Sequence, residues 1–176
     1  MYAMTLHADA ALRQQLNDLS TLLRSARIDA GLRRRSLAAE LQVSTTALAD
    51  WETCADDPTM SHLIRWASAL GFRLAIVDPV GSPELSPARL DEGESWEEHE
   101  MRRLATALWA RRRSRRMSQE SLAVQIGVGR ISMQRWESTQ VFPRPIAFLA
   151  WARALECSVV LHAGNGPFPP DHFPEF

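Results

Sequence analysis

The sequence predicts a mainly α-helical protein made of two tandem copies of one unit, in which four helices are followed by a strand. Three observations support this prediction. The 176-residue chain is 45% hydrophobic, which is enough for two small cores. Most of its apolar residues recur at helical spacing. An ungapped offset of 85 residues gives identical residues at roughly 15 of about 60 positions, which indicates an internal duplication.

The duplication sets the expected domain boundaries. It is clearest where Trp51-Glu52 falls on Trp136-Glu137. The same offset places Leu19 on Leu104, Leu23 on Leu108, Arg27 on Arg112, 36–38 on 121–123, Val43 on Val128, Pro58 on Pro143, Trp66-Ala67 on Trp151-Ala152, and Ala69-Leu70 on Ala154-Leu155. We expect domains at residues 8–78 and 96–163, joined by an acidic, Pro-containing linker at 79–95 and followed by a flexible tail at 164–176.

The first unit begins with a long amphipathic helix, expected over residues 8–30, whose leucines share one face. Shorter helices are expected over residues 36–41, 45–53 and 60–70, the second of them capped by Ser44. The tryptophans of the third and fourth helices of both units are expected in the core, where an indole ring buries most apolar surface, and not as groups that stack on bases.

A strand is expected after the fourth helix of each unit. In the first unit Phe72, Leu74 and Ile76 alternate with Arg73 and Ala75, and the pattern stops before Pro79. This alternation predicts a strand over residues 72–77.

The second unit repeats this order. Its helices are expected over residues 96–113, 119–126, 130–138 and 145–155, and its strand over residues 157–162.

Residues 118–137 have the pattern of a helix-turn-helix. Apolar residues recur at helical spacing, Gly127 supplies a left-handed break, and the pattern resumes at Val128, Ile131 or Met133, and Trp136. This stretch resembles the helix-turn-helix of the Cro/C1-type (XRE-like) repressor family, with Gln119, Leu122, Ala123, Gly127, Val128, Trp136 and Glu137 in the positions of the family pattern. The resemblance implies two lambda-repressor-like domains that bind double-stranded DNA and regulate transcription, in this case as a repressor.

The strand after the fourth helix resembles that of the HipB-type antitoxins, whose subunits pair these strands to form a dimer. Here both strands belong to one chain. Because a lone edge strand leaves backbone donors and acceptors unpaired, we expect residues 72–77 to pair antiparallel with residues 157–162. The chain would then be a covalent pseudo-dimer.

The second helix of the motif is expected in the major groove of DNA. By motif position, the contacts implied for the second unit are Gln119, Gly129, Arg130, Ile131, Ser132 and Arg135. Arginine pairs best with guanine O6 and N7, which favours a half-site that contains guanine.

The corresponding positions of the first unit carry different side chains: Arg34, Thr45, Thr46, Ala49 and Asp50. If both units bind, the DNA site should be asymmetric, with two unlike half-sites about one helical turn apart. If the first unit instead docks a partner or mediates dimerisation, only one half-site will be recognised.

Charge is distributed unevenly along a chain whose net charge is −1. Residues 79–100 carry one Arg and seven Asp or Glu, whereas residues 101–176 carry eleven Arg and five Asp or Glu. Only the last segment has the charge of a DNA-binding surface. The side chains expected to contact phosphate are Arg111, Arg112, Arg113, Arg115, Arg116, Ser138 and Arg144.

Two segments allow a second interpretation. The linker and the acidic run from Asp91 to Glu100 are expected to be a solvated spacer, the alternative being that the run competes with DNA for the Arg cluster. The tail is expected to be frayed, the alternative being that Phe168, Phe173 and Phe176 dock on a groove.

Other function classes find little support in the sequence. It has no phosphate loop, no metal-spaced cluster and no catalytic motif, so we expect no enzyme, cofactor or metal, and Cys54 and Cys157 are expected to be plain thiols. No apolar run could span a membrane and no signal peptide is evident, so the protein is expected in the cytoplasm, associated with the nucleoid. We expect a bacterial, phage-encoded or plasmid-encoded protein that is a monomer or a weak homodimer. The alternative function is an antitoxin or a protein-interaction module that binds a toxin-like or regulatory partner protein and autoregulates its promoter.

Overall fold

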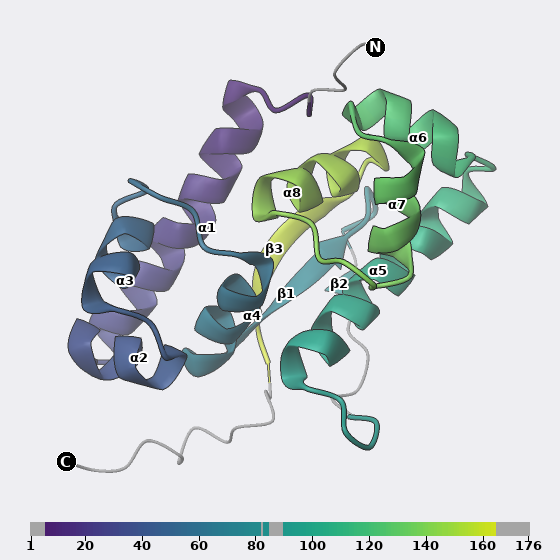
Figure 1. The fold of residues 1–176 in the computed structure, drawn as a ribbon. Helices are drawn as coiled ribbons and strands as arrows, with labels where there is room; N and C mark the ends of the chain where they lie inside the picture. The colour runs from purple at the N-terminus through teal and green to yellow at the C-terminus, as the bar shows by residue number, and fades with distance from the viewer. Residues whose placement is uncertain (1–5, 82, 85–89, 165–176) are drawn as a thin grey trace.

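Helices dominate the computed structural model, which describes residues 6–81, 83–84 and 90–164 (Figure 1). In the first half they are α1 (Ala10–Asp29), α2 (Arg34–Leu41), α3 (Thr45–Glu52) and α4 (Met60–Ala69), followed by the strand β1 (Phe72–Val77). After the short strand β2 (Pro83–Glu84) come α5 (Trp96–Ser114), α6 (Gln119–Ile126), α7 (Arg130–Glu137), α8 (Pro145–Ala154) and the strand β3 (Ser158–Ala163). The mainly α-helical class predicted from the sequence is confirmed.

The strands β1 and β3 pair antiparallel, from Phe72 opposite Ala163 to Val77 opposite Ser158. The expected pairing is confirmed, although β3 lies one residue later than predicted. The sequence did not predict β2, which pairs with the other edge of β1 at Ile76 and Val77. This part of the linker is therefore a strand of the sheet.

The structure repeats its element order with the offset of 85. The bounds of α2 and α3 fall on those of α6 and α7, and the bounds of α4 fall on those of α8. The first helix of each half packs on the fourth helix of the other half: α1 packs on α8, and α5 packs on α4. In Figure 1 the equivalent elements lie opposite one another across the middle of the molecule. The two halves are thus held by two interfaces of the same kind.

A continuous core contains all four tryptophans that were expected there. Trp66 and Trp151 are fully buried, and Trp51 and Trp136 are at most 8% exposed. In α7 the core residue is Met133, whereas Ile131 is 65% exposed, which decides between the two alternatives for that position. Because the burial of these apolar rings is favourable, it holds α3, α4, α7 and α8 against the rest of their half.

Both faces of β1 are covered by other parts of the protein. The alternation of apolar and polar residues in its sequence therefore does not mean that one face is exposed to water. Arg73 is 6% exposed and donates to Glu100 of α5 at 2.5 Å, and Arg103 donates to the same carboxylate at 2.9 Å. Arg73 also lies over the ring of Trp96, 5.2 Å from its centroid. Burial alone would raise the pKa of Glu100, but the hydrogen bonds from the two arginines outweigh it and lower the pKa below its ordinary value.

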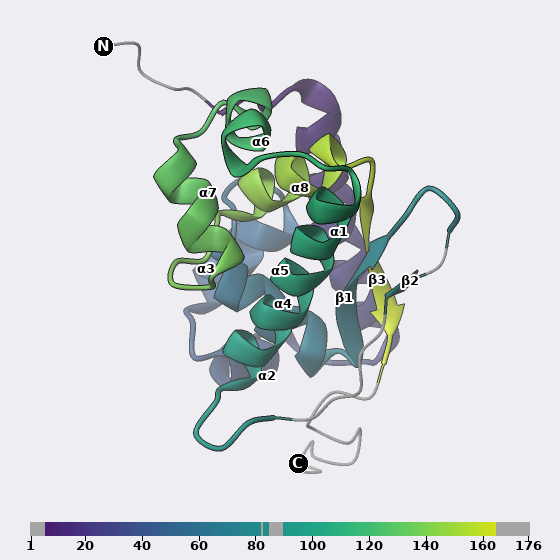
Figure 2. The ribbon, with the colours of Figure 1, turned by 90° about the vertical axis from the view of Figure 1, so that its right-hand side faces the viewer.

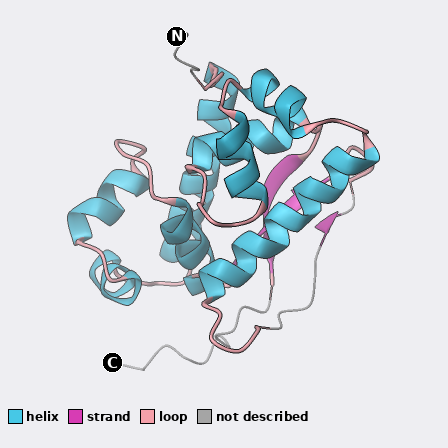
Figure 3. Cartoon of the chain, turned by 45° about the vertical axis from the view of Figure 1, so that its right-hand side comes forward, coloured by secondary structure: helices cyan, strands magenta, loops and turns pink. Residues whose placement is uncertain are grey.

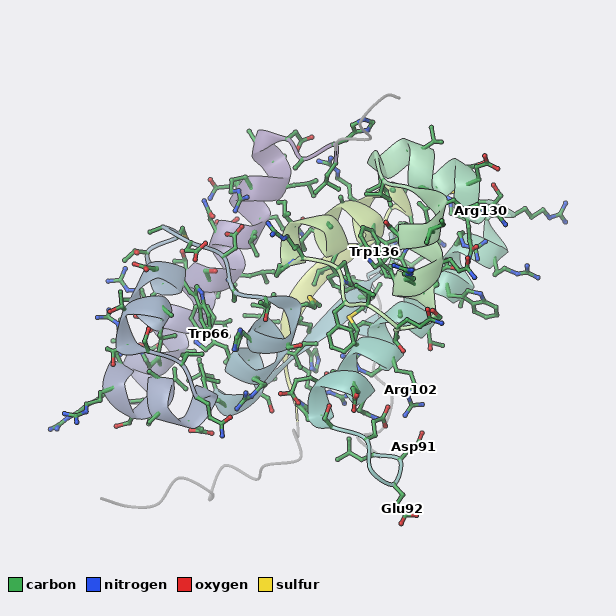
Figure 4. The ribbon with its side chains drawn as sticks, in the orientation of Figure 1. Trp66, Asp91, Glu92, Arg102, Arg130 and Trp136 are labelled. Carbon is green, nitrogen blue, oxygen red and sulfur yellow. The ribbon has the colours of Figure 1, made fainter. Side chains whose placement is uncertain are left out.

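The rest of the acidic run is also used within the fold. Arg102 binds Glu94 at 2.7 Å and Asp91 at 3.0 Å, and its hydrogen bond lowers the pKa of Glu94 to about 2. Figure 4 shows Asp91 and Glu92 beside the N-terminal end of α5, far from Arg130. The Arg cluster, the five arginines at 111–113 and 115–116, lies at the C-terminal end of α5, a helix about 28 Å long at 1.5 Å per residue. The acidic run therefore does not reach the Arg cluster, and the competition considered from the sequence is wrong.

None of the helices in the described part of the chain has the length and apolar character required to cross a bilayer. The tail residues Phe168, Phe173 and Phe176 lie outside the described residues.

Candidate nucleic-acid interface

The turn between α6 and α7 is built by two glycines. Gly127 ends α6 in the left-handed region, with φ of 84°, and donates its N–H to the carbonyl of Ala123. Gly129 is the N-cap residue of α7, which has no side-chain cap in the structure. The first turn of α7 therefore keeps backbone N–H groups that no cap side chain occupies, as a phosphate contact at a helix N-terminus requires.

The exposed face of α7 carries most of the expected base contacts. Arg130, Ile131 and Arg135 are exposed, and Ser132 is half-buried. In Figure 4 the Arg130 side chain extends away from the body of the protein, whereas Trp136 points into it. Gln134, which was not predicted from the sequence, is exposed on the same face. The duplication could have predicted this residue, because Gln134 is 85 residues after Ala49, one of the DNA contacts expected in the first unit.

A buried carboxylate fixes α7 to the two helices before it. Glu137 accepts hydrogen bonds from Arg112 of α5 at 2.5 Å and from Gln119 of α6 at 2.7 Å. Arg112 also donates to the carbonyl of Met117 at 2.7 Å and is only 6% exposed. The structure thus corrects the expected role of Arg112, whose guanidinium is enclosed by protein and cannot meet a phosphate. Gln119 braces the helix-turn-helix from within.

The first half contains the same arrangement. Glu52 accepts from Arg27 at 2.5 Å and from Arg34 at 2.9 Å, and Arg27 also donates to the carbonyl of Leu32. Arg34 is therefore anchored on a buried carboxylate, as Gln119 is in the second half.

The remaining arginines of the expected phosphate cluster divide into two groups. Arg111 donates to the carbonyl of Leu155 at 3.2 Å, and Arg115 pairs with Glu156 at 2.9 Å. Arg113 and Arg116 are exposed. Arg144 and Ser138, at the start of α8 and the end of α7, are also exposed. The surface around α7 thus presents Arg113, Arg116, Arg130, Arg135 and Arg144 to solvent.

The corresponding face of α3 has smaller side chains than that of α7 and carries no arginine. Thr45 and Thr46 are exposed, and Ala49 and Asp50 are half-buried. The Ser44 hydroxyl accepts from the N–H of Ala47, so this helix start is capped. Two exposed cations that were not predicted as DNA contacts, Arg33 and Arg35, lie at the beginning of α2. They are the candidates for phosphate contact in the first half.

The two helices α3 and α7 lie on one side of the molecule. Figure 2 shows both on the left, with the strands on the right, and Figure 1 shows them at opposite ends. Figure 3 shows that the strands lie behind the helices and that α5 runs along the molecule beside them. One duplex could therefore face α3 and α7 together.

A comparison with protein families matches residues 23–77 to the family described as Helix-turn-helix. The matched segment runs from the second half of α1 to the end of β1, and so contains α2 and α3. The match lies in the first half of the chain, whereas the sequence pattern described above is clearest at residues 118–137 of the second half. The match supports a helix-turn-helix of the Cro/C1 type in the first half. Neither the curated proteins nor the solved structures gave a match.

Proposed function

We propose, from the helix-turn-helix at residues 23–77, that the protein is a sequence-specific regulator of transcription that binds double-stranded DNA, most simply as a repressor. In this proposal the second half is a second DNA-binding unit, and the single chain takes the place of a dimer. The recognition helices would be α3 and α7.

The observation that carries the proposal is that α3 and α7 lie on the same side of the molecule, while α1 packs on α8 and α5 packs on α4. Those contacts and the paired strands β1 and β3 hold the two helices in a fixed relation. A dimeric helix-turn-helix protein holds its two recognition helices in a fixed relation with two chains, for half-sites about 34 Å apart.

The two faces would recognise unlike half-sites. On α7, Arg130 and Arg135 favour guanine, and Gln134 favours adenine. On α3, the methyl groups of Thr45 and Thr46 suit thymine, and the carboxylate of Asp50 can accept from cytosine N4. A chain with unlike faces gains nothing from a palindrome, so the operator would be asymmetric.

The protein-partner alternative rested on the acidic linker and on the tail. The acidic residues Glu94, Glu97 and Glu100 are paired with arginines inside the fold. No contact among the described residues thus favours an acidic docking surface over a DNA-binding one.

Binding to mixed-sequence duplex DNA at low salt tests the proposal. We expect Arg130→Ala/Arg135→Ala to weaken binding by about ten-fold, because two cations are lost from the surface that faces the phosphate backbone at low salt. Arg24→Ala is the control, since this exposed arginine lies on α1. Equal loss in the double variant and the control would contradict the proposed surface.

A further inference from the structure

An apolar groove lies between the C-terminal half of α1 and the ends of β1 and β3. Its volume is about 490 Å³, and its walls are Leu22, Ser25, Ala26, Asp29, Leu70, Phe72 and Leu161. Leu22 is 56% exposed. An open groove with apolar walls is a site where a hydrophobic side chain could leave water.

The second half has the equivalent groove, at the offset of 85. It is smaller, about 270 Å³, and is lined by Ile76, Asp78, Ala107, Ala110, Arg111, Ser114 and Cys157. Here Ala107 stands where the first groove has Leu22, and Arg111 stands where it has Ala26. The Arg111 side chain donates to the carbonyl of Leu155 at 3.2 Å across this site.

The chain that leaves β1 passes along this second groove. Asp78, the first residue after β1, forms part of its wall. The Asp78 carboxylate accepts from the N–H groups of Val80 and Gly81, and this turn leads into β2, which pairs with β1. The smaller groove is thus occupied by an arginine and bordered by the chain that follows its strand.

By the same offset, the chain that leaves β3 begins at the first groove. The N–H of Gly164 donates to the carbonyl of Gly71 at 3.2 Å, between the groove residues Leu70 and Phe72 in sequence. Twelve residues follow, 165–176, with three phenylalanines. Phe168 is four residues beyond Gly164, a reach of about 13 Å for an extended chain.

We propose that the C-terminal segment 165–176 of the same chain binds this groove, with the Phe168 ring against Leu22, Phe72 and Leu161. Ala26 leaves room in the first groove that Arg111 takes in the second, and an aromatic ring fills it. The strands that form one wall lie on the side away from α3 and α7 (Figure 2). The inference goes beyond the DNA-binding proposal and stands independently of it.

Disulfide formation in the full chain tests this binding, in a Cys54→Ser background that removes the half-exposed native thiol. One variant combines Ser25→Cys, inside the groove, with Pro169→Cys. The control combines Arg24→Cys with Pro169→Cys. Residues 24 and 25 are neighbours and both exposed, so an unbound tail would reach them equally. Far-UV circular dichroism checks that the variants fold.

If the segment binds the groove, the Ser25→Cys variant forms a monomeric disulfide at least about ten-fold faster than the Arg24→Cys control. Adding Phe168→Ala removes this difference. Equal rates for the two pairs, or a difference that survives Phe168→Ala, would overturn the proposal. Disulfide-linked dimers at dilute concentration would also overturn it, because the groove would then hold the tail of a second copy. None of these outcomes depends on DNA.

Discussion

Arg112 and Glu137 form an ion pair at 2.5 Å in the interior of the second half, with 7% and 4% of their side chains exposed. Arg27 and Glu52 form the equivalent pair at the same distance in the first half. Each pair joins the first helix of its half to the proposed recognition helix. The orientation of α7, the proposed recognition helix, therefore depends on a carboxylate that is buried.

Removal of this carboxylate should destabilise the protein. Glu137→Gln leaves the buried Arg112 without a counter-charge, and breaking a buried pair in this way costs about 3 kcal/mol or more. Urea unfolding followed by tryptophan fluorescence measures the loss. Glu156→Gln is the matched control, because Glu156 is 62% exposed at its side chain and should change stability by about 0.5 kcal/mol at most. Similar losses for the two variants would show that the buried pair is not structural.

The contacts of Glu100 predict how stability depends on pH. The arginine hydrogen bonds lower the folded pKa of Glu100 below the ordinary value of 4.5, so the unfolded chain binds the proton more tightly. The stabilisation is complete above about pH 5 and is lost as pH falls below 4.5. The free energy of unfolding should fall less steeply between pH 5 and pH 3 in Glu100→Gln than in the wild type. Parallel pH profiles would contradict this role.

The exposed arginines Arg113 and Arg116 should act on the phosphate backbone. Replacement of both with Ala should weaken DNA binding similarly for all sequences and reduce the slope of log K against log salt by about one per lost contact. Arg112→Ala is unsuitable as a comparison because it removes a buried ion pair. Arg24→Ala should leave the slope unchanged, and an unchanged slope in the double variant would place the DNA elsewhere.

Gln134 should contribute to sequence preference. Its exposed amide can make two hydrogen bonds to adenine N6 and N7. Gln134→Ala should relax the preference at one A·T position by about 1 to 3 kcal/mol while other positions keep theirs. Binding to a set of single-base variants of a selected site measures this. Loss of affinity that is uniform across the set would mean that Gln134 contacts no base.

The sequence predicted the features that depend on local spacing and on the duplication. Trp136 could be assigned to the core from its helical spacing and from Trp51 at the equivalent position. The strands could be paired because the first has an alternating apolar pattern, the second follows the fourth helix of the other unit, and a lone edge strand leaves backbone groups unpaired.

Features that depend on distant residues were not predictable in this way. A run of five arginines has the pattern of a solvated surface, and nothing local shows that Arg112 turns inward to meet Glu137, 25 residues later. Alternation places Arg73 on the polar face of its strand, but α5 covers that face and its Glu100 pairs with Arg73. The burial of charged groups requires a partner, and the partner is set by packing.

The most direct test of a single-chain protein with two unlike DNA-binding faces is the selection of binding sites from random duplex DNA. Wild type and Arg130→Ala/Arg135→Ala would be compared at moderate salt. We expect one asymmetric motif with two unlike half-sites about one helical turn apart, and we expect the variant to lose the half-site recognised by α7. A palindromic motif would contradict the account, because it would mean that two chains pair through one kind of face. No enriched sequence would contradict sequence-specific binding itself.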